Sequence, residues 1–375
     1  MITTINNKHK KLNVPNLRFP EFEGEWEEYR IEDITENISS GRCKSHSSSG
    51  KYNLYGSTGI IGKTNEACYE GNLVLVARVG ANAGSLQILN EPCGITDNTL
   101  IIKPKEVDVQ YIYYFLQHFN LNRLIFGSGQ PLITGGMLKK VKVSLGTIQE
   151  QNKITRLLSV LDERITTQNK IIDKLQSLIK GISNKLLNSK EGMLVCLGAI
   201  LKERSEKTKK NNQYAVLSST VNGLFSQRDY FSKDIASENN VGYKIIRLHD
   251  VVLSPQNLWM GNINYNDKFD IGIVSPSYKV FLISDDYDKR YVAAMLKTHR
   301  ALYDYQLISE QGASVVRRNL NLESFGQLVF RIPPLDKQRE IGKTISLLKS
   351  RLETESMLKA TYQSQKQYLL RQMFI

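Results

Sequence analysis

The chain has 375 residues, long enough for two globular domains, and 41% of them are hydrophobic. Lys and Arg number 50 against 37 Asp and Glu, so the formal net charge is +13 and points to a polyanionic partner, either nucleic acid or an anionic membrane surface. No apolar run approaches the roughly 20 residues that cross a bilayer, and the polar start MITTINNKHKKLN lacks the apolar stretch of a signal peptide. We therefore expect a cytoplasmic protein.

The cysteines and histidines are scattered along the chain. The four cysteines form no C-x-x-C pair, and no two of the five histidines lie four residues apart. We therefore expect reduced thiols and no bound metal.

The first globular stretch begins with an acidic segment, because residues 21–36 include eight Asp and Glu, which makes this segment unsuited to DNA contact. Farther on, residues 73–79 are rich in Val and Leu and predict a strand, and YIYYFL (111–116) predicts a short apolar helix. Gly and Asn turns separate these elements. We predict a mixed α/β domain over residues 14–146, preceded by a flexible arm of residues 1–13.

A long helix is predicted next, over residues 147–190. After I148-Q-E-Q-N-K-I154, apolar residues recur at alternating spacings of four and three, a heptad pattern that only Gln168 interrupts. This first seam comprises Ile154, Leu158, Leu161, Ile165, Ile172, Leu175, Ile179, Ile182 and Leu186.

The second half of the chain repeats this order. A strand at 277–283 and an apolar helix at YVAAML (291–296) indicate a second mixed α/β domain over 191–334. Pro333-Pro334 marks its end, and L335-D-K-Q-R-E-I341 begins a second long helix over 335–375.

The second helix also carries a seam, which loosens after its first half. Its apolar members are Ile341, Ile345, Leu348 and Leu352, and Glu355, Lys359 and Tyr362 follow at matching positions. Two such seams in one chain predict that the helices pair with each other as an antiparallel coiled coil. The expected fold is α+β, with two mixed α/β domains separated by the paired helices in a pseudo-two-fold internal repeat.

The motifs of common DNA and nucleotide enzymes are missing from the sequence. The segment G56-STGII-G62-K63-T64 has one residue too many between its glycines for a phosphate-binding loop. No Asp or Glu is followed two positions later by Lys, as in many metal-dependent nucleases, and no N-P-P-aromatic signature of adenine methylation occurs. There is also no nucleophile elbow or dinucleotide loop. These absences favour a binding protein over an enzyme.

Several polar segments suit DNA contact. The basic segment 202–210 could position phosphates, or it could be a solvated loop or helix end. Residues 42–51 combine cations with small flexible residues, although a disordered surface loop would look the same. Asn, Gln and Arg in the second domain could read base edges. The candidates are Arg42, Lys44, Ser47, Lys51, Tyr55, Ser57, Thr58, Lys63, Arg78, Lys202, Lys207, Lys209, Gln256, Asn257, Trp259, Asn262, Arg317, Arg318 and Asn319.

Across residues 14–375 the sequence resembles the specificity subunit of type I restriction-modification systems. The blocks that carry the resemblance are VPNLRFPEFEGEWEEYRIEDI (14–34), YGSTGIIGKT (55–64), EGNLVLVARVGANAG (70–84), I148-Q-E-Q-N-K-I154 and IVSPSYKVF (273–281). The second half departs from the pattern: it opens MLVCLGAI without a Trp, and Lys337 stands where the first half has Glu150.

The resemblance implies a non-catalytic subunit that recognises double-stranded DNA. Each domain would read one part of a split target, and the paired helices would hold the domains apart. Two modification subunits would methylate adenine with S-adenosylmethionine, and restriction subunits would translocate and cleave DNA with ATP and Mg²⁺, so the resemblance places no cofactor on this chain. From the residues alone, a basic nuclease or methyltransferase with an unrecognised site and a coiled-coil scaffold remain open alternatives.

Overall fold

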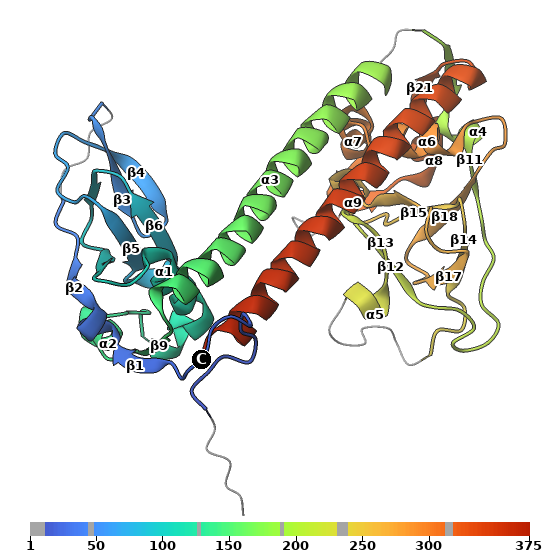
Figure 1. Ribbon diagram of the computed structural model, residues 1–375. Coiled ribbons are helices and arrows are strands. Elements are labelled where there is room, and N and C mark those ends of the chain that lie inside the picture. The colour runs from blue at the N-terminus through green and yellow to red at the C-terminus, as the bar shows by residue number, and fades with distance from the viewer. Residues whose placement is uncertain (1–11, 44–48, 126–128, 188–190, 231–238, 312–317) are drawn as a thin grey trace, which may run out of the picture. The chain divides into compact units, whose positions relative to one another are not determined.

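The computed structural model of the protein describes residues 12–43, 49–125, 129–187, 191–230, 239–311 and 318–375, so the predicted arm of residues 1–13 lies almost entirely outside the described residues. The chain forms two compact units (Figure 1): unit 1 comprises residues 1–169 and 357–375, and unit 2 comprises residues 170–356. Each unit holds one mixed α/β domain and a part of both long helices, α3 (Ile148–Leu187) and α9 (Leu335–Met373).

Unit 1 is built on a four-stranded antiparallel sheet in the order β2-β8-β5-β6. A three-stranded sheet, β4-β3-β7, and a short pair, β1-β9, accompany it. The elements of the domain are β1 (Glu27–Arg30), η1 (Ile31–Ile34), β2 (Thr35–Ser40), β3 (Tyr52–Gly56), β4 (Gly59–Thr64), β5 (Asn72–Ala77), η2 (Gly80–Asn82), β6 (Leu86–Asn90), β7 (Cys93–Ile95), β8 (Thr99–Pro104), α1 (Val109–Phe119), η3 (Leu121–Leu124), α2 (Gly135–Lys139) and β9 (Lys142–Leu145).

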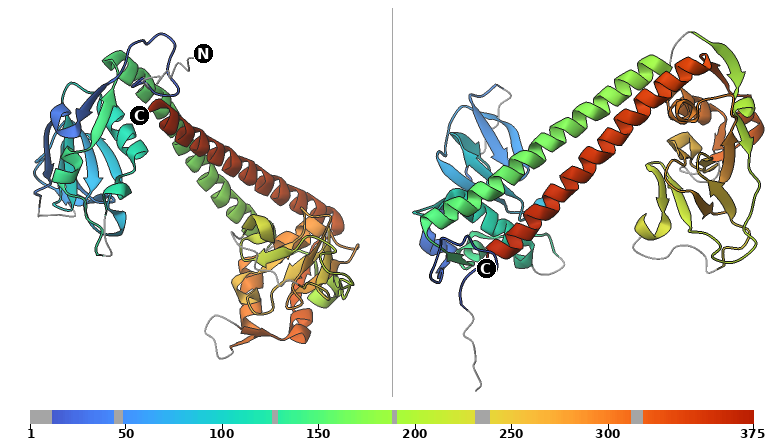
Figure 2. Two further views of the ribbon diagram at one scale, coloured as in Figure 1. Left: turned by 90° about the horizontal axis from the view of Figure 1, so that it is seen from below. Right: turned by 45° about the vertical axis from the view of Figure 1, so that its right-hand side comes forward.

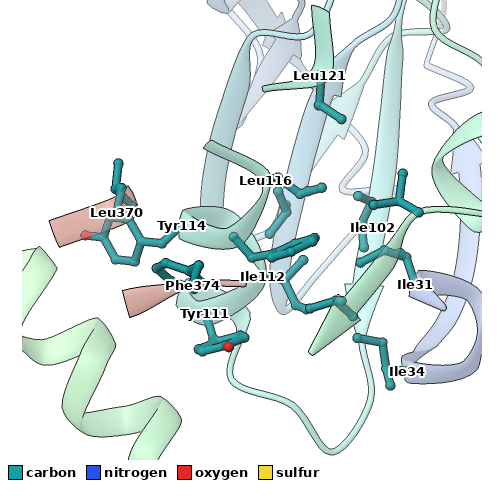
Figure 3. Packing of buried hydrophobic residues seen from close by; sticks show 14 of the residues in the cluster. Ile31, Ile34, Ile102, Tyr111, Ile112, Tyr114, Leu116, Leu121, Leu370 and Phe374 are labelled. Atoms are coloured by element: carbon teal, nitrogen blue, oxygen red, sulfur yellow. The ribbon is translucent and has the colours of Figure 1, made fainter. Parts of the chain in front are cut away.

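The core of unit 1 joins helix α1 to the C-terminal end of α9. Tyr111 and Phe115 of α1 are almost fully buried, and Phe374 packs on both rings, with its centroid 5.1 Å from that of Tyr111. Figure 3 shows Phe374 and Leu370 lying against this face of α1. The end of the chain is therefore part of the first domain's hydrophobic core, and burial of these aromatic side chains stabilises it.

A buried carboxylate fixes the start of α3 in unit 1. Glu150 is 1% exposed, and both its oxygens are bound by Arg18, from Nε at 2.8 Å and from Nη2 at 2.9 Å. The indole Nε1 of Trp26 donates to the same carboxylate at 3.1 Å. A Cβ at Gly146 would come within 2.7 Å of that indole nitrogen, so only glycine fits there. The acidic opening segment thus folds onto α3 through Trp26.

Unit 2 repeats the sheet order of unit 1, as β11-β18-β15-β16, and its terminal pair β10-β21 corresponds to β1-β9. The elements are β10 (Met193–Cys196), α4 (Leu197–Ile200), β11 (Leu201–Glu203), β12 (Leu217–Thr220), β13 (Gly223–Ser226), α5 (Gln227–Tyr230), β14 (Lys244–Arg247), β15 (Val251–Leu253), η4 (Leu258–Met260), β16 (Ile263–Tyr265), β17 (Ile271–Val274), β18 (Lys279–Ile283), α6 (Lys289–Met295), α7 (His299–Leu307), β19 (Ser309–Gln311), β20 (Arg318–Leu320), α8 (Leu322–Gln327) and β21 (Val329–Ile332).

The glutamine in the first helix-start motif clamps two elements together. Asp108 caps α1 by accepting a hydrogen bond from the Tyr111 backbone N–H at 2.8 Å. Gln151 Oε1 accepts from the Asp108 N–H at 3.3 Å, and its Nε2 donates to the Gly146 carbonyl at 3.0 Å. The start of α3 is thereby tied to the start of α1.

The same clamp recurs in unit 2. Asp288 caps α6 through the Tyr291 N–H at 2.9 Å, and Gln338 Oε1 accepts from the Asp288 N–H at 3.0 Å. Gln338 Nε2 donates to the Pro333 carbonyl at 2.9 Å. The repeat seen in the sequence is therefore a repeat of structure down to individual hydrogen bonds, and the predicted pseudo-two-fold α+β fold is confirmed.

The long helices pack together within each unit, and Figure 2 shows their segments running in opposite directions. In unit 1, Lys366 of α9 pairs with Asp162 of α3 at 2.6 Å, and Leu161 shares a core with Leu369. In unit 2, Leu186 packs against the core that contains Ile345. Every predicted seam residue is buried or half-buried; these are Ile154, Leu158, Leu161, Ile165, Ile172, Leu175, Ile179, Ile182, Leu186, Ile341, Ile345, Leu348 and Leu352.

Replacing Leu161 or Ile165 by Lys should destabilise the helix pair by about 2 to 5 kcal/mol each, because a charge would replace buried apolar contacts. Leu161 is 4% exposed and should give the larger loss. The measurement is urea unfolding followed by Trp26 fluorescence in a Trp259→Phe background. Val160→Lys is the matched control because Val160 is 41% exposed on the same turn. Equal unfolding midpoints for Leu161→Lys and the control would contradict a buried seam.

Candidate nucleic-acid interface

In unit 1, the loop after the third strand of the sheet meets the segment before α2, a contact we call the first junction. The Arg78 carbonyl accepts from the Ile133 N–H at 2.8 Å. The carbonyl of Asn98 accepts from both the Arg78 N–H at 2.9 Å and the Ser57 hydroxyl at 3.1 Å. Three predicted candidates, Arg78, Ser57 and the exposed Thr58 beside it, therefore come together.

Unit 2 has an equivalent second junction, after β15. The Arg318 N–H donates to the Gln256 carbonyl at 3.1 Å, and the Arg318 guanidinium lies over the Trp259 ring at 4.8 Å from its centroid. Gln256 and Asn319 are exposed beside it. The structure therefore brings the candidates Gln256 and Trp259 next to Arg318 and Asn319, which lie much later in the sequence.

Each junction holds an arginine, Arg78 in the loop after β5 and Arg318 at the start of β20. The Nε atoms of Arg78 and Arg318 are buried and have no hydrogen-bond partner among the described residues. An arginine stacked on an aromatic ring presents a planar fork of donors, which suits the O6 and N7 acceptors of guanine or a phosphate. Arg318 meets this description through Trp259, whereas Arg78 has no such ring beside it among the described residues.

Two candidates of the first domain belong instead to an internal network. Tyr55 is buried, and its hydroxyl donates to Glu91 Oε1 at 2.6 Å. Burial, followed by this hydrogen bond, raises the pKa of Tyr55 to about 12. Lys63 donates to Asn53 at 2.8 Å, and Asn53 in turn donates to Glu91 at 2.8 Å. The hydrogen bond from Tyr55 lowers the pKa of Glu91, so this network is held by an ionised carboxylate that sequence reasoning did not single out.

Asn262 also lies in the interior. It is 4% exposed, its amide donates to the Ser219 carbonyl at 3.0 Å, and it accepts from the Ser219 hydroxyl at 2.7 Å. Asn257 is half-buried and shapes the turn, because its carbonyl accepts from the Met260 and Asn262 N–H groups. Tyr55 and Asn262 are therefore interior residues and not the surface contacts that the sequence predicted.

The basic segment of unit 2 is divided between structure and surface. Arg204 pairs with the buried Asp250 at 2.8 Å and is a structural residue. Lys202, Lys207 and Lys209 are exposed, and no ion pair engages them within the described part of the chain. These three lysines remain available to a polyanion.

Two candidates between β2 and β3 lie on the surface. Arg42 and Lys51 are exposed, and the Lys51 ammonium lies 5.2 Å from the Tyr52 ring centroid. Three predicted candidates, Lys44, Ser47 and Arg317, lie outside the described residues.

The described residues contain no group of three or more His, Cys, Asp or Glu placed to hold a metal ion. None of the helices described here combines the length and apolar character of a membrane span.

Parts of the sequence are similar to known proteins. Residues 23–177 match the family described as the type I restriction modification DNA specificity domain. The chain is 26% identical over 112 residues to the Escherichia coli type I restriction enzyme EcoprrI specificity subunit, covering 30% of this chain and 28% of that protein. It is 30% identical over 113 residues to the Methanocaldococcus jannaschii type I restriction enzyme MjaVIII specificity subunit, covering 28% of this chain and 27% of that protein. The matches thus span little more than a quarter of these relatives' length.

The fold match extends much further than the sequence matches. The crystal structure of the type I restriction-modification system S subunit from M. genitalium superposes with a TM-score of 0.67 at 16% identity, covering 96% of this chain and 99% of that one. This likeness shows a shared fold of two mixed α/β domains with two long helices. The predicted resemblance to the specificity subunits of type I restriction-modification systems is confirmed by the family match and by these relatives.

Proposed function

We propose that this chain is the DNA sequence-specificity subunit of a type I restriction-modification complex and acts in the cytoplasm. It binds a double-stranded target in two parts, one for each domain. The observation that carries the proposal is the structural repeat, because both units repeat the same four-stranded sheet, and in each an arginine lies where the loop after the sheet's third strand meets a later segment. Two equivalent reading surfaces in one chain match a target with two half-sites.

The reactions would then belong to partner subunits. Two modification subunits would bring S-adenosylmethionine and methylate adenine in the target, and restriction subunits would bring ATP and Mg²⁺. The chain would bind DNA through its basic surface and direct these subunits to the target. Phosphate contacts would set its position, and contacts from the two junctions to base edges would set its specificity.

The purified chain should bind duplex DNA but neither methylate nor cleave it. Affinity for a random duplex should fall steeply between about 50 and about 200 mM salt, because each neutralised phosphate releases counterions. Binding is measured by fluorescence anisotropy, and methyl transfer with labelled S-adenosylmethionine. Methylation by this polypeptide alone, or cleavage with Mg²⁺ and ATP, would instead identify an enzyme. Salt-independent affinity would indicate a scaffold with no nucleic-acid role.

A further inference from the structure

Unit 2 contains a hollow of about 620 Å³ between its domain and helix α9. The domain side is formed by residues of β13, β16, the turn after β16, and α6, and the other side by one face of α9. Six charged side chains line it: the cations Lys268, Arg290, Lys297 and Lys349 and the acids Asp267 and Glu353. None of these residues was singled out from the sequence.

Two of these cations have no acidic partner of their own. Glu353 pairs with Lys268 at 2.9 Å, and Arg290 pairs with Asp288 at 3.4 Å. Lys297 and Lys349 form no ion pair within the described residues, although both face the hollow. Burial lowers the pKa of Lys349, and the nearby Asp267 and Glu353 oppose that shift. With Asp288 on Arg290, the four cations face three acids, so one positive charge is left uncompensated.

Lys297 is held in place by neutral groups. Its ammonium donates to Asn264 Oδ1 at 2.7 Å and to the Val221 carbonyl at 3.2 Å. Burial, followed by the nearby charge of Lys349, lowers the pKa of Lys297 to about 8. Two ammonium groups that repel each other in a partly desolvated hollow are stabilised when an anion binds between them.

The rest of the lining indicates which anion fits. Ser346 and Ser350 on α9 and Asn222 on the domain side add hydroxyl and amide donors. Lysine, serine and asparagine are side chains that commonly contact phosphate oxygens of the DNA backbone. The hollow is large and open, and it belongs to a unit that the proposed function assigns to DNA recognition.

We propose that this hollow, which we call the phosphate groove, binds the sugar-phosphate backbone of DNA, with Lys297 and Lys349 contacting phosphates. The proposal rests on the proposed function and adds a positioning surface to it. The groove contributes affinity and orientation but no base discrimination, because its contacts are with phosphates.

The test compares the salt dependence of duplex binding in charge-neutralising variants of the full chain. Lys349→Gln and Lys297→Gln should each reduce the slope of log affinity against log salt by about 1, and should weaken target and non-target duplexes equally. Lys349→Arg should keep the wild-type slope. Lys343→Gln is the control, because Lys343 is also exposed on α9 but does not line the groove. Circular dichroism checks that each variant is folded.

The possible outcomes distinguish failure of the groove proposal from failure of the proposed function. If the wild-type chain binds duplex without salt dependence, the proposed function fails and the groove proposal fails with it. If the wild type shows the slope and both glutamine variants match Lys343→Gln, the groove proposal alone is overturned. A third measurement uses inorganic phosphate at matched ionic strength. If phosphate saturates the wild-type groove while the variants keep full DNA affinity, the groove binds a small anion, and the proposal is again overturned.

The pH dependence gives an independent readout. Lys297 is charged below its pKa of about 8. The charged groups that line the groove with it are Asp267 and Lys268 of the turn after β16, Arg290 of α6, and Lys349 and Glu353 of α9. Bound phosphate favours the charged form, so DNA affinity should fall as the pH rises through about 8 and Lys297 loses its proton. This decline should flatten in Lys297→Gln and persist in Lys343→Gln. An identical decline in both variants would contradict the role of Lys297.

Discussion

Replacing Arg18 by Met is expected to destabilise unit 1 by about 3 to 5 kcal/mol, the cost of leaving one member of a buried ion pair without its partner. Glu150 is 1% exposed, and Arg18 binds both of its oxygens. Without the guanidinium, the carboxylate would keep only its hydrogen bonds to neutral donors such as Trp26. The readout is urea unfolding followed by Trp26 fluorescence, in a Trp259→Phe background.

Two further variants test whether charge is the cause. Glu150→Gln in the Arg18→Met background should recover much of the loss, because an amide can still accept from Trp26 and needs no counter-charge. Arg30→Met is the control: Arg30 pairs with Glu32 in an exposed contact, and such surface pairs contribute about 0 to 1 kcal/mol. A loss in Arg18→Met no larger than in the control would show that Glu150 does not need this partner.

The same cluster explains the two departures of the second half from the first. The sequence showed that the second half lacks an opening Trp and that Lys337 replaces Glu150. Because Trp26 donates to Glu150, these two departures remove both partners of one interaction. The glutamine clamp does not depend on this pair, since Gln338 bonds like Gln151. The start of α9 is therefore held by Gln338 without an equivalent of Trp26.

Periodicity made the architecture predictable, because heptad spacing and the repeated helix-start motif depend on local order in the sequence. The continuation of the second seam was only partly visible. Lys359, Tyr362 and Lys366 are half-buried at seam spacing, and Tyr362 lies under the guanidinium of Arg164 at 5.7 Å. Amphipathic side chains can bury their stems there, so a polar seam residue weakens the apolar pattern without ending the packing.

The contact residues were less predictable, because composition does not say whether a polar side chain points to water or to another side chain. Tyr55 and Asn262 looked like surface candidates, yet Glu91 and Ser219 hold them inside. Conversely, Lys297 and Lys349 face one hollow from segments about fifty residues apart, which no local motif records. Of the junction arginines, Arg78 lies in the block EGNLVLVARVGANAG, whereas Arg318 was predicted only as a residue type that can read base edges.

Lengthening both long helices by four residues should change the spacing of the recognised half-sites. Under the proposed function the helices separate two reading domains. Four residues add roughly 6 Å at about 1.5 Å per residue, against about 3.4 Å for each base pair of DNA. The spacer between the half-sites should therefore grow by one or two base pairs.

The insertions are best placed after Gln168 in α3 and after Glu355 in α9. Each is a buried polar residue at which the apolar seam is already interrupted, with 5% and 3% exposure respectively. Four residues disturb a heptad repeat least, because they unwind it locally and leave the apolar face inward. Lengthening both helices keeps their pairing in register, and an insertion in α3 alone serves as the mismatched control.

Sequencing methylated adenines in cells that express the variant with its partner subunits measures the result. We expect both half-sites to be unchanged and the spacer to be longer, because neither domain is altered and only the separation grows. The mismatched control should lose methylation, since α3 would no longer match α9. If the doubly extended chain methylates the original target with the original spacer, the helices do not set the spacing.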